Sequence, residues 1–175
     1  VVVSAVDADG TTNAVTYAIT AQSCAGAFSI DSGTGVVSVD DSTALDFDTS
    51  ASCTLTVEAT SADGSADDET FTVSLTDVND QAPVYTPTDA SPTVTEGDTA
   101  VDNVQITDTD TGDTNTCSLS GQDSSLFTCT VTESEYTLAF TNAPDFENPL
   151  DAGANNNYLV YVTISDGTNT GQTAQ

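Results

Sequence analysis

The sequence contains no lysine, arginine or histidine at any of its 175 positions, and it also lacks methionine and tryptophan. Without cationic side chains the chain cannot neutralise phosphates, so nucleic acid is excluded as a partner. An anionic membrane surface would repel the chain for the same reason. The commonest general base is missing, as are the residues that form Schiff bases or hold oxyanions, which argues against most enzyme classes.

A pair of carboxylates that hydrolyses a glycosidic bond is the one catalytic arrangement that this composition permits. Tryptophan is absent, and only five tyrosines and six phenylalanines are present to stack against a sugar. We therefore expect that the chain is not an enzyme.

Long apolar runs are absent as well. No apolar run reaches the roughly 18 residues of a membrane-spanning helix, so we expect none. No basic segment precedes an apolar stretch at the start, so we expect no signal peptide in this stretch. The targeting segment of an exported protein would then lie outside it.

Acidic residues are abundant: 28 aspartates and glutamates give a formal net charge of −28, which destabilises a compact state through self-repulsion. A disordered acidic tail is disfavoured because apolar residues are spread evenly along the chain. The remaining explanations are a solvated acidic surface in a salty medium and carboxylates that bind hard cations, which prefer oxygen ligands. We favour cation binding, acting together with a solvated surface, since no carboxylate has a basic partner.

The four cysteines, Cys24, Cys53, Cys117 and Cys129, fall at no zinc-ligand spacing. An even count in a loop-rich chain indicates disulfides and hence an oxidising compartment. Three pairings are open. We favour Cys24–Cys53 with Cys117–Cys129, because each bridge then stays within one half of the chain.

Short runs with apolar and polar residues in alternation indicate half-buried strands, and turn-forming glycines separate them at intervals typical of a β-sandwich. The clearest runs are residues 1–6, 14–20, 36–39, 53–59, 70–76, 101–107, 136–140 and 158–165.

An internal repeat divides the chain. Each half contains an Asp-x-Asp segment, then an asparagine, then an acidic segment around a phenylalanine, and later an Asp-Gly turn. A stretch rich in oxygen-bearing side chains, ending at Pro83, lies between the halves. The repeated elements are residues 7–9, 13, 45–48 and 63–64 in the first half, and 108–110, 115, 144–147 and 166–167 in the second.

These segments resemble the cadherin family over nearly the whole chain. Asp77-Val78-Asn79-Asp80-Gln81-Ala82-Pro83 is similar to the linker between cadherin repeats, Asp-x-Asn-Asp-Asn-x-Pro, with Gln81 in place of the last asparagine. The Asp-x-Asp segments are similar to a loop of the family, and residues 45–48 and 145–147 to its Leu-Asp-x-Glu motif. Asp48 is one methylene shorter than the usual glutamate, and Glu96 stands where the family keeps a glutamate on its opening strand.

The resemblance implies an all-β fold of two tandem Greek-key, immunoglobulin-like β-sandwiches. The first repeat would cover residues 1–81 and end in a calcium linker at 77–83, and the second would cover 82–175. We expect the opening strand to be missing from the first repeat and the closing strand from the second. The chain would then be a slice of a longer tandem array, or a filament subunit completed by strands from its neighbours.

The family binds three calcium ions between consecutive repeats, and the resemblance assigns the ligands here. Gln81 and Asn115 would contribute backbone carbonyls. The central junction would use Asp46, Asp48, Asp77, Asn79, Asp80, Gln81, Asp108, Asp110, Asn115 and Asp166. The terminal half-sites would use Asp7, Asp9, Asn13 and Asp63 at one end, and Glu96, Asp145 and Glu147 at the other.

Physical chemistry supports this assignment independently. Calcium takes about six to eight oxygen ligands, and carboxylates from two domains repel one another unless cations lie between them. Bound ions would fix the angle between the repeats, and the linker would be a hinge without them. We therefore expect an extracellular or cell-surface calcium-dependent structural repeat that forms part of a stiff rod or filament.

The alternative is a calcium-dependent cell-surface adhesin that recognises like repeats or glycans. No aromatic cluster stands out in the sequence, and the tryptophan anchor that some family members exchange between partners is absent, which favours the structural role. The expected partners are neighbouring repeats of the same protein or like subunits in a fibre.

Overall fold

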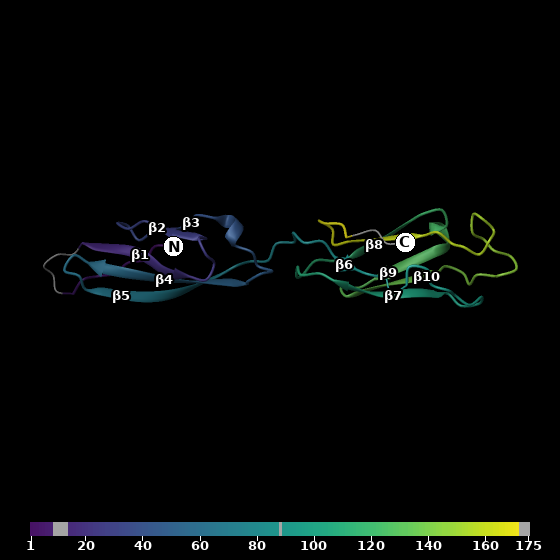
Figure 1. Cartoon of the computed structure of the whole chain (residues 1–175), viewed down its shortest axis with the longest axis horizontal. Coiled ribbons are helices and arrows are strands. Elements are labelled where there is room, and N and C mark those ends of the chain that lie inside the picture. The colour runs from purple at the N-terminus through teal and green to yellow at the C-terminus, as the bar shows by residue number, and fades with distance from the viewer. Residues whose placement is uncertain (9–13, 88, 172–175) are drawn as a thin grey trace. The chain divides into compact units, whose positions relative to one another are not determined.

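Two compact units of β-structure, Val1–Asp77 and Val78–Gln175, make up the computed structural model of the chain (Figure 1). The structure describes residues 1–8, 14–87 and 89–171. In these residues the helices are two single turns, η1 (Ser42–Ala44) and η2 (Ser124–Leu126), and neither has the length that a membrane span requires. The predicted all-β fold is confirmed.

The first unit contains a three-stranded antiparallel sheet and a small two-stranded one. Burial alternates along the central strand of the larger sheet, where Cys53, Leu55 and Val57 point into the core. The larger sheet has the order β1 (Val15–Gln22), β4 (Ser52–Ser61), β5 (Ala66–Ser74), and the smaller one pairs β2 (Phe28–Ile30) with β3 (Val37–Val39).

The second unit has four strands in one sheet and two in another. The first sheet has the order β6 (Val84–Tyr85), β7 (Ala100–Thr107), β10 (Glu135–Phe140), β9 (Phe127–Val131), and the second pairs β11 (Tyr161–Ser165) with β8 (Thr116–Ser120). All of these pairings are antiparallel.

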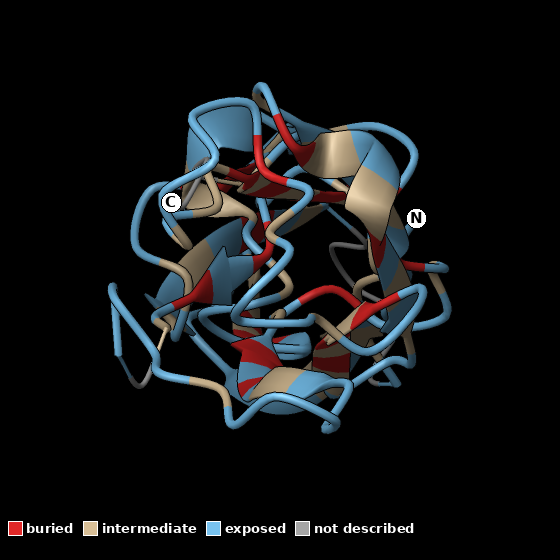
Figure 2. Ribbon diagram, turned by 90° about the vertical axis from the view of Figure 1, so that its right-hand side faces the viewer, coloured by how far each residue is buried: buried red, intermediate tan, exposed pale blue. Residues whose placement is uncertain are grey.

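The core of each unit lies between its two sheets, as in a sandwich. In the first unit Tyr17 of β1 and Leu55 of β4 pack with Phe28 of β2. In the second unit Leu138 of β10 and Ile164 of β11 belong to one buried cluster. Figure 2 shows the resulting alternation of buried and exposed positions along the ribbons. The period-two pattern of the sequence therefore reflects strands with one buried face.

Both predicted disulfides, Cys24–Cys53 and Cys117–Cys129, are present. Each closes a loop within one unit. Cys117 belongs to β8 and Cys129 to β9, so the second bridge joins the two sheets of its unit covalently.

Some strands differ from the sequence-based expectation. The predicted strand at residues 1–6 is reduced to a bridge between Val2 and Val36. Strands β2, β8 and β9 were not predicted from alternation. Their exposed positions carry serine and threonine, and β2 has only three residues, so the apolar alternation in these segments is short or weak.

Candidate cation site

Three carboxylates of the second unit meet where β7 and β11 end. Asp108 directly follows β7, Asp166 directly follows β11, and Asp113 lies in the loop between β7 and β8. Each offers one oxygen, and these oxygens all lie within 4.8 Å of one another. The sequence contains no lysine, arginine or histidine to balance these charges.

The same loop buries oxygen atoms that accept no hydrogen bond. Asp110 and Asn115 are only 6% and 8% exposed. A buried polar atom without a partner costs free energy, and such atoms are rare in folded proteins. The buried, unpartnered atoms in this loop are Asp108 Oδ2, Asp110 Oδ1, Asp113 Oδ2 and Asn115 Oδ1.

These atoms fit a hard cation. All of them are carboxylate or amide oxygens, and calcium coordinates about six to eight such oxygens at once. A bound cation would satisfy the unpartnered oxygens and balance the carboxylate charges together. The residues present therefore fit the metal that the sequence predicts.

Hydrogen bonds hold the loop in place. The Asp110 amide donates to Asp108 Oδ1 at 3.3 Å, and the Asn115 Nδ2 donates to the Glu133 carbonyl at 3.2 Å. The Gln81 amide donates to Asp110 Oδ2 at 2.9 Å, which ties the linker segment to the loop. One oxygen of Asp110 is thus used for positioning, while the other has no partner.

The turn after β11 presents Asp166 to the same place. Gly167 has a φ of 95°, a conformation that glycine adopts without strain, and it reverses the chain directly after Asp166. The Thr168 amide can then donate to Asp166 Oδ1 at 2.7 Å. The Asn169 side chain donates from Nδ2 to Asn79 Oδ1 and to the Gln81 carbonyl, both at 2.8 Å.

The pKa values of Asp108 and Asp166 are shifted in opposite directions. Burial raises the pKa of the Asp108 carboxyl, although the Asp110 amide opposes this effect. The negative charges of Asp113, Asp110 and Asp166 raise that pKa further. Burial acts on Asp166 too, but hydrogen bonds from the backbone amides of Asn169 and Thr168 and from the side chains of Asn169 and Asn79 together outweigh it, and its pKa lies below the ordinary value. The fold therefore disfavours the charged form of the Asp108 carboxyl.

Most residues of the second unit that the sequence assigned to the central junction lie around this loop. Asp80 is exposed and accepts a hydrogen bond from Gln81 Nε2 at 2.9 Å. Sequence reasoning missed Asp113 and Asn169. Asp113 could have been noticed as a third carboxylate in the Asp108-Thr109-Asp110-Thr111-Gly112-Asp113 segment, whereas nothing in the sequence distinguishes Asn169.

The assigned residues of the first unit lie in turns and loops. Asp46 and Asp48 are exposed in the segment after η1, and Asp77 follows β5 and is half-buried. Thr49 donates to Asp46 through its amide and its hydroxyl, and the hydroxyl bond is the larger cause that lowers the pKa of Asp46.

The expected half-site at the start of the chain is described only in part. Ser61 Oγ donates to Asp7 Oδ2 at 2.6 Å, and the Ser65 amide donates to Asp63 Oδ1 at 2.9 Å. Asp9 and Asn13 lie outside the described residues.

A second acidic group brings together Glu96, Asp145 and Glu147. Each offers an oxygen within 4.8 Å of the others, and all three side chains are exposed. The Phe146 amide donates to Glu96 Oε2 at 3.1 Å. The structure thus assembles the half-site that the sequence assigned to these residues, but its oxygens are solvated and the group gives weaker evidence for an ion.

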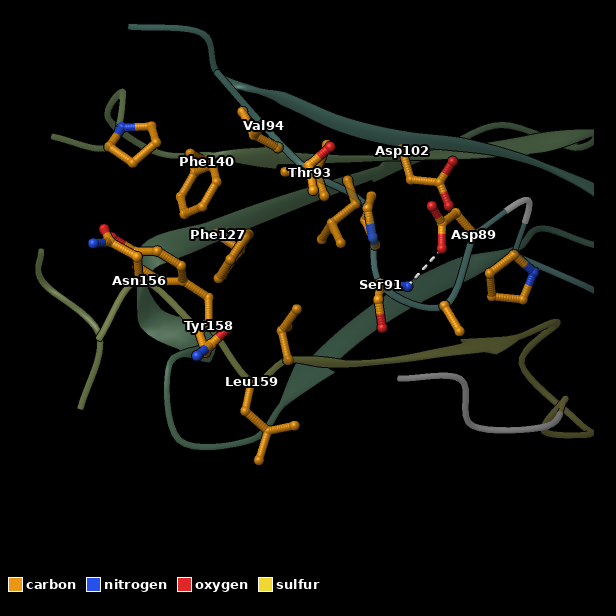
Figure 3. A pocket seen from close by; sticks show the side chains of 18 of the residues that line it. Asp89, Ser91, Thr93, Val94, Asp102, Phe127, Phe140, Asn156, Tyr158 and Leu159 are labelled. Atoms are coloured by element: carbon orange, nitrogen blue, oxygen red, sulfur yellow. Dashed lines mark hydrogen bonds between the residues drawn. The ribbon is translucent and has the colours of Figure 1, made fainter. Parts of the chain in front are cut away.

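A cavity of about 520 Å³ lies in the second unit, lined by Pro87, by residues 89–94 and Glu96, and by side chains of the core (Figure 3). Phe127, Phe140 and Tyr158 form part of its wall, while Asp89 and Asp102 lie on another side. Hydroxyl groups line it, but no cysteine does, and the chain has no histidine or lysine that could activate a nucleophile. The carboxylates among its lining residues are Asp89, Glu96 and Asp102.

Comparison with known proteins identifies the fold. A family model of the cadherin domain matches residues 1–76, and Protocadherin Fat 4 of Mus musculus is 39% identical over 118 residues, which is 63% of this chain. Residues 1–76 thus match a cadherin domain, and the chain as a whole is similar to cadherins. It spans only 2% of the length of that protocadherin.

Solved cadherin structures extend the similarity to both units. Protocadherin Gamma B7 extracellular cadherin domains 1-4 are 25% identical with a TM-score of 0.66, over 88% of this chain and 37% of that one. The human Desmocollin-1 ectodomain, at 21% identity, has a TM-score of 0.64 over 90% of this chain and 33% of that one, which shows the shared fold. Both of these structures are of cadherin ectodomains.

Proposed function

We propose that this chain is an extracellular or cell-surface repeat of the cadherin type that binds calcium, and that the bound ions fix the junction between its two units. The observation that carries the proposal is the set of buried, unpartnered oxygens at Asp108, Asp110, Asp113 and Asn115. Such oxygens need a donor or a cation, and the chain has no cationic side chain.

The ligands proposed for the central junction divide into two groups. Asp108, Asp110, Asp113, Asn115 and Asp166 form the part of the site that the second unit supplies. The linker and the first unit complete the junction through the residues that the cadherin resemblance assigns to them: Asp46, Asp48, Asp77, Asn79, Asp80 and Gln81. The group of Glu96, Asp145 and Glu147, and that of Asp7, Asp9, Asn13 and Asp63, take part in further junctions of the same kind.

The role is mechanical and not catalytic. A repeat that binds ions at its junctions transmits length and stiffness, and the partners of such a repeat are neighbouring repeats of the same protein or like subunits in a fibre. The chain has no histidine or lysine, two of the residues that activate nucleophiles at neutral pH.

Calorimetric titration tests the proposal. Calcium added to chelator-stripped protein is expected to bind at several sites per chain, and the unfolding temperature is expected to rise because the ion binds the native state. A titration with magnesium is the control, since magnesium demands a stricter geometry and gives up its water reluctantly. Absence of both heat and a shift in unfolding temperature at millimolar calcium would contradict the proposal.

Adhesion between like repeats is the second candidate. One similar structure, also 25% identical to this chain, is the cis-dimer of Protocadherin gammaB7 EC3-6. Sedimentation in calcium at increasing concentration separates the roles. A structural repeat that only joins repeats of its own chain stays monomeric, an adhesive repeat forms a closed dimer, and a fibre subunit associates into open-ended assemblies.

A further inference from the structure

One asparagine draws together oxygens from distant parts of the second unit. Asn169 Nδ2 lies 2.8 Å from Asn79 Oδ1, 2.8 Å from the Gln81 carbonyl oxygen and 3.3 Å from Asp166 Oδ2. Asn79 and Gln81 belong to the linker segment, 90 and 88 residues away in the sequence. All three acceptors belong to residues that the proposed function assigns to the calcium site.

The amide group of Asn169 supplies hydrogens with partial positive charge in a chain that has no cationic side chain. Oxygens that converge on one place repel one another, and here no lysine, arginine or histidine can relieve that repulsion. An amide NH₂ has two hydrogens with partial positive charge and can serve two acceptors fully. Asn169 therefore keeps the linker oxygens beside Asp166 in a molecule without an ion.

We propose that Asn169 is a positioning residue of the cation site, which assembles the Asn79, Gln81 and Asp166 oxygens before an ion binds. The proposal rests on the calcium function proposed above. A site whose ligands are already in place loses less conformational freedom on binding, which raises its affinity. Residues that orient metal ligands by hydrogen bonds typically change metal affinity by about 10–100-fold when they are replaced.

The first unit provides an internal comparison. Its corresponding turn is Asp63-Gly64-Ser65-Ala66, against Asp166-Gly167-Thr168-Asn169 in the second unit. Both turns have a glycine with positive φ, and in both the residue after that glycine donates its amide to the aspartate. Ala66 has no side-chain donor. The turn therefore forms without an asparagine at this position.

The comparison suggests the variant to test. Asn169→Ala gives the second turn the residue that the first unit has there, so the fold should be retained, and a dispersed amide NMR spectrum checks this. Asn103→Ala is the matched control, since Asn103 is an exposed asparagine of β7 outside the site. Both variants are made in the whole 175-residue chain.

Two measurements are needed. In a titration with calcium alone, Asn169→Ala is expected to weaken affinity by about tenfold with no change in the number of ions bound. In the chelator-stripped protein, ¹⁵N relaxation is expected to show greater mobility of the Asn79 and Gln81 amides in this variant. Asn103→Ala should match the wild type in both measurements.

The outcomes separate this inference from the proposed function. If the wild type binds no calcium, the proposed function fails and the assignment of Asn169 to a cation site fails with it. If the wild type binds calcium and Asn169→Ala binds it equally well, only the inference about Asn169 is overturned. An unchanged linker in the ion-free variant overturns that inference as well, because positioning before ion binding is its central claim.

Discussion

At the scale of single residues, Asp113 separates the effect of charge from the effect of ion binding. Its carboxylate lies with those of Asp108 and Asp166, and one of its oxygens is buried without a hydrogen-bond partner. Without an ion this charge raises the energy of the fold, as the raised pKa of Asp108 indicates. With an ion, the same charge contributes to binding.

Replacing Asp113 with asparagine should therefore change stability in opposite directions under two conditions. In chelator the variant is expected to be more stable than the wild type, because one repulsive charge is removed. In saturating calcium it is expected to be less stable than the wild type. Its calcium affinity should fall by at least about tenfold, since replacing a residue that only supports a metal ligand already lowers affinity by about that factor. Urea denaturation followed by circular dichroism measures both.

Asp98→Asn is a control for net charge, since Asp98 lies in an exposed turn of the same unit. A variant at Asp113 that loses stability in chelator would contradict the prediction, because the carboxylate would then have a stabilising role unrelated to an ion.

The cadherin resemblance assigned Asp108, Asp110 and Asp166 to the calcium site through the Asp-x-Asp segment and the Asp-Gly turn. Residues whose place in the site depends on the path of the chain were not assigned. Asp113 and Asn169 join them only because the loop after β7 and the turn after β11 are shaped by their glycines, with φ values of 86° at Gly112 and 95° at Gly167. Such three-dimensional reversals are not evident from residue type alone.

At the scale of elements, the loop between β10 and β11 depends on one buried carboxylate. Asp151 is 5% exposed and accepts hydrogen bonds from the amides of Gly153, Asn155 and Asn156 at 3.0–3.2 Å. Burial alone would raise the pKa of Asp151, but these amides outweigh it and the pKa lies below the ordinary value. The charged carboxylate thus holds this loop without a metal ion.

The sign of this pKa shift gives a pH prediction. Because the pKa is lower in the folded state, the contribution of Asp151 is present above the unfolded value of about 3.9 and is lost as pH falls through the folded value. Asp151→Asn should lower the urea midpoint at pH 6 in chelator, and the difference from the wild type should shrink as pH falls below about 4. A difference that persists unchanged at low pH would show that shape, and not charge, is the contribution of Asp151.

The sequence predicted the strands with a clear apolar face and missed strands whose pairing depends on the rest of the fold. Strands with a clear apolar face, such as β4 and β10, were recognised from alternation. Strand β8 alternates over only five residues and was missed, and its pairing with β11 defines it. Residues 1–6, Val-Val-Val-Ser-Ala-Val, are mostly apolar, but in the described part of the chain they make a single bridge, because β-propensity alone does not ensure a partner strand.

At the scale of the whole molecule, the proposed role depends on the effect of calcium on the linker segment, residues 77–83, which contains the boundary between the two units. The acidic residues of the linker and of both units repel one another in the absence of cations. Removal of calcium is therefore expected to give the units more freedom relative to each other while each remains folded. Small-angle X-ray scattering reports this as a broader distribution of interatomic distances.

Asp80→Ala tests whether the linker carboxylates carry this effect. Asp80 is exposed, so its removal should leave the second unit folded, and the scattering of the variant in calcium should resemble that of the wild type in chelator. Asp67→Ala, at an exposed position of β5, is the control for loss of one negative charge and should scatter like the calcium-loaded wild type. If chelation leaves the wild-type distribution unchanged, calcium does not govern the junction. The ions would then serve only the loops of single units, and a repeat of this kind would not gain stiffness from them.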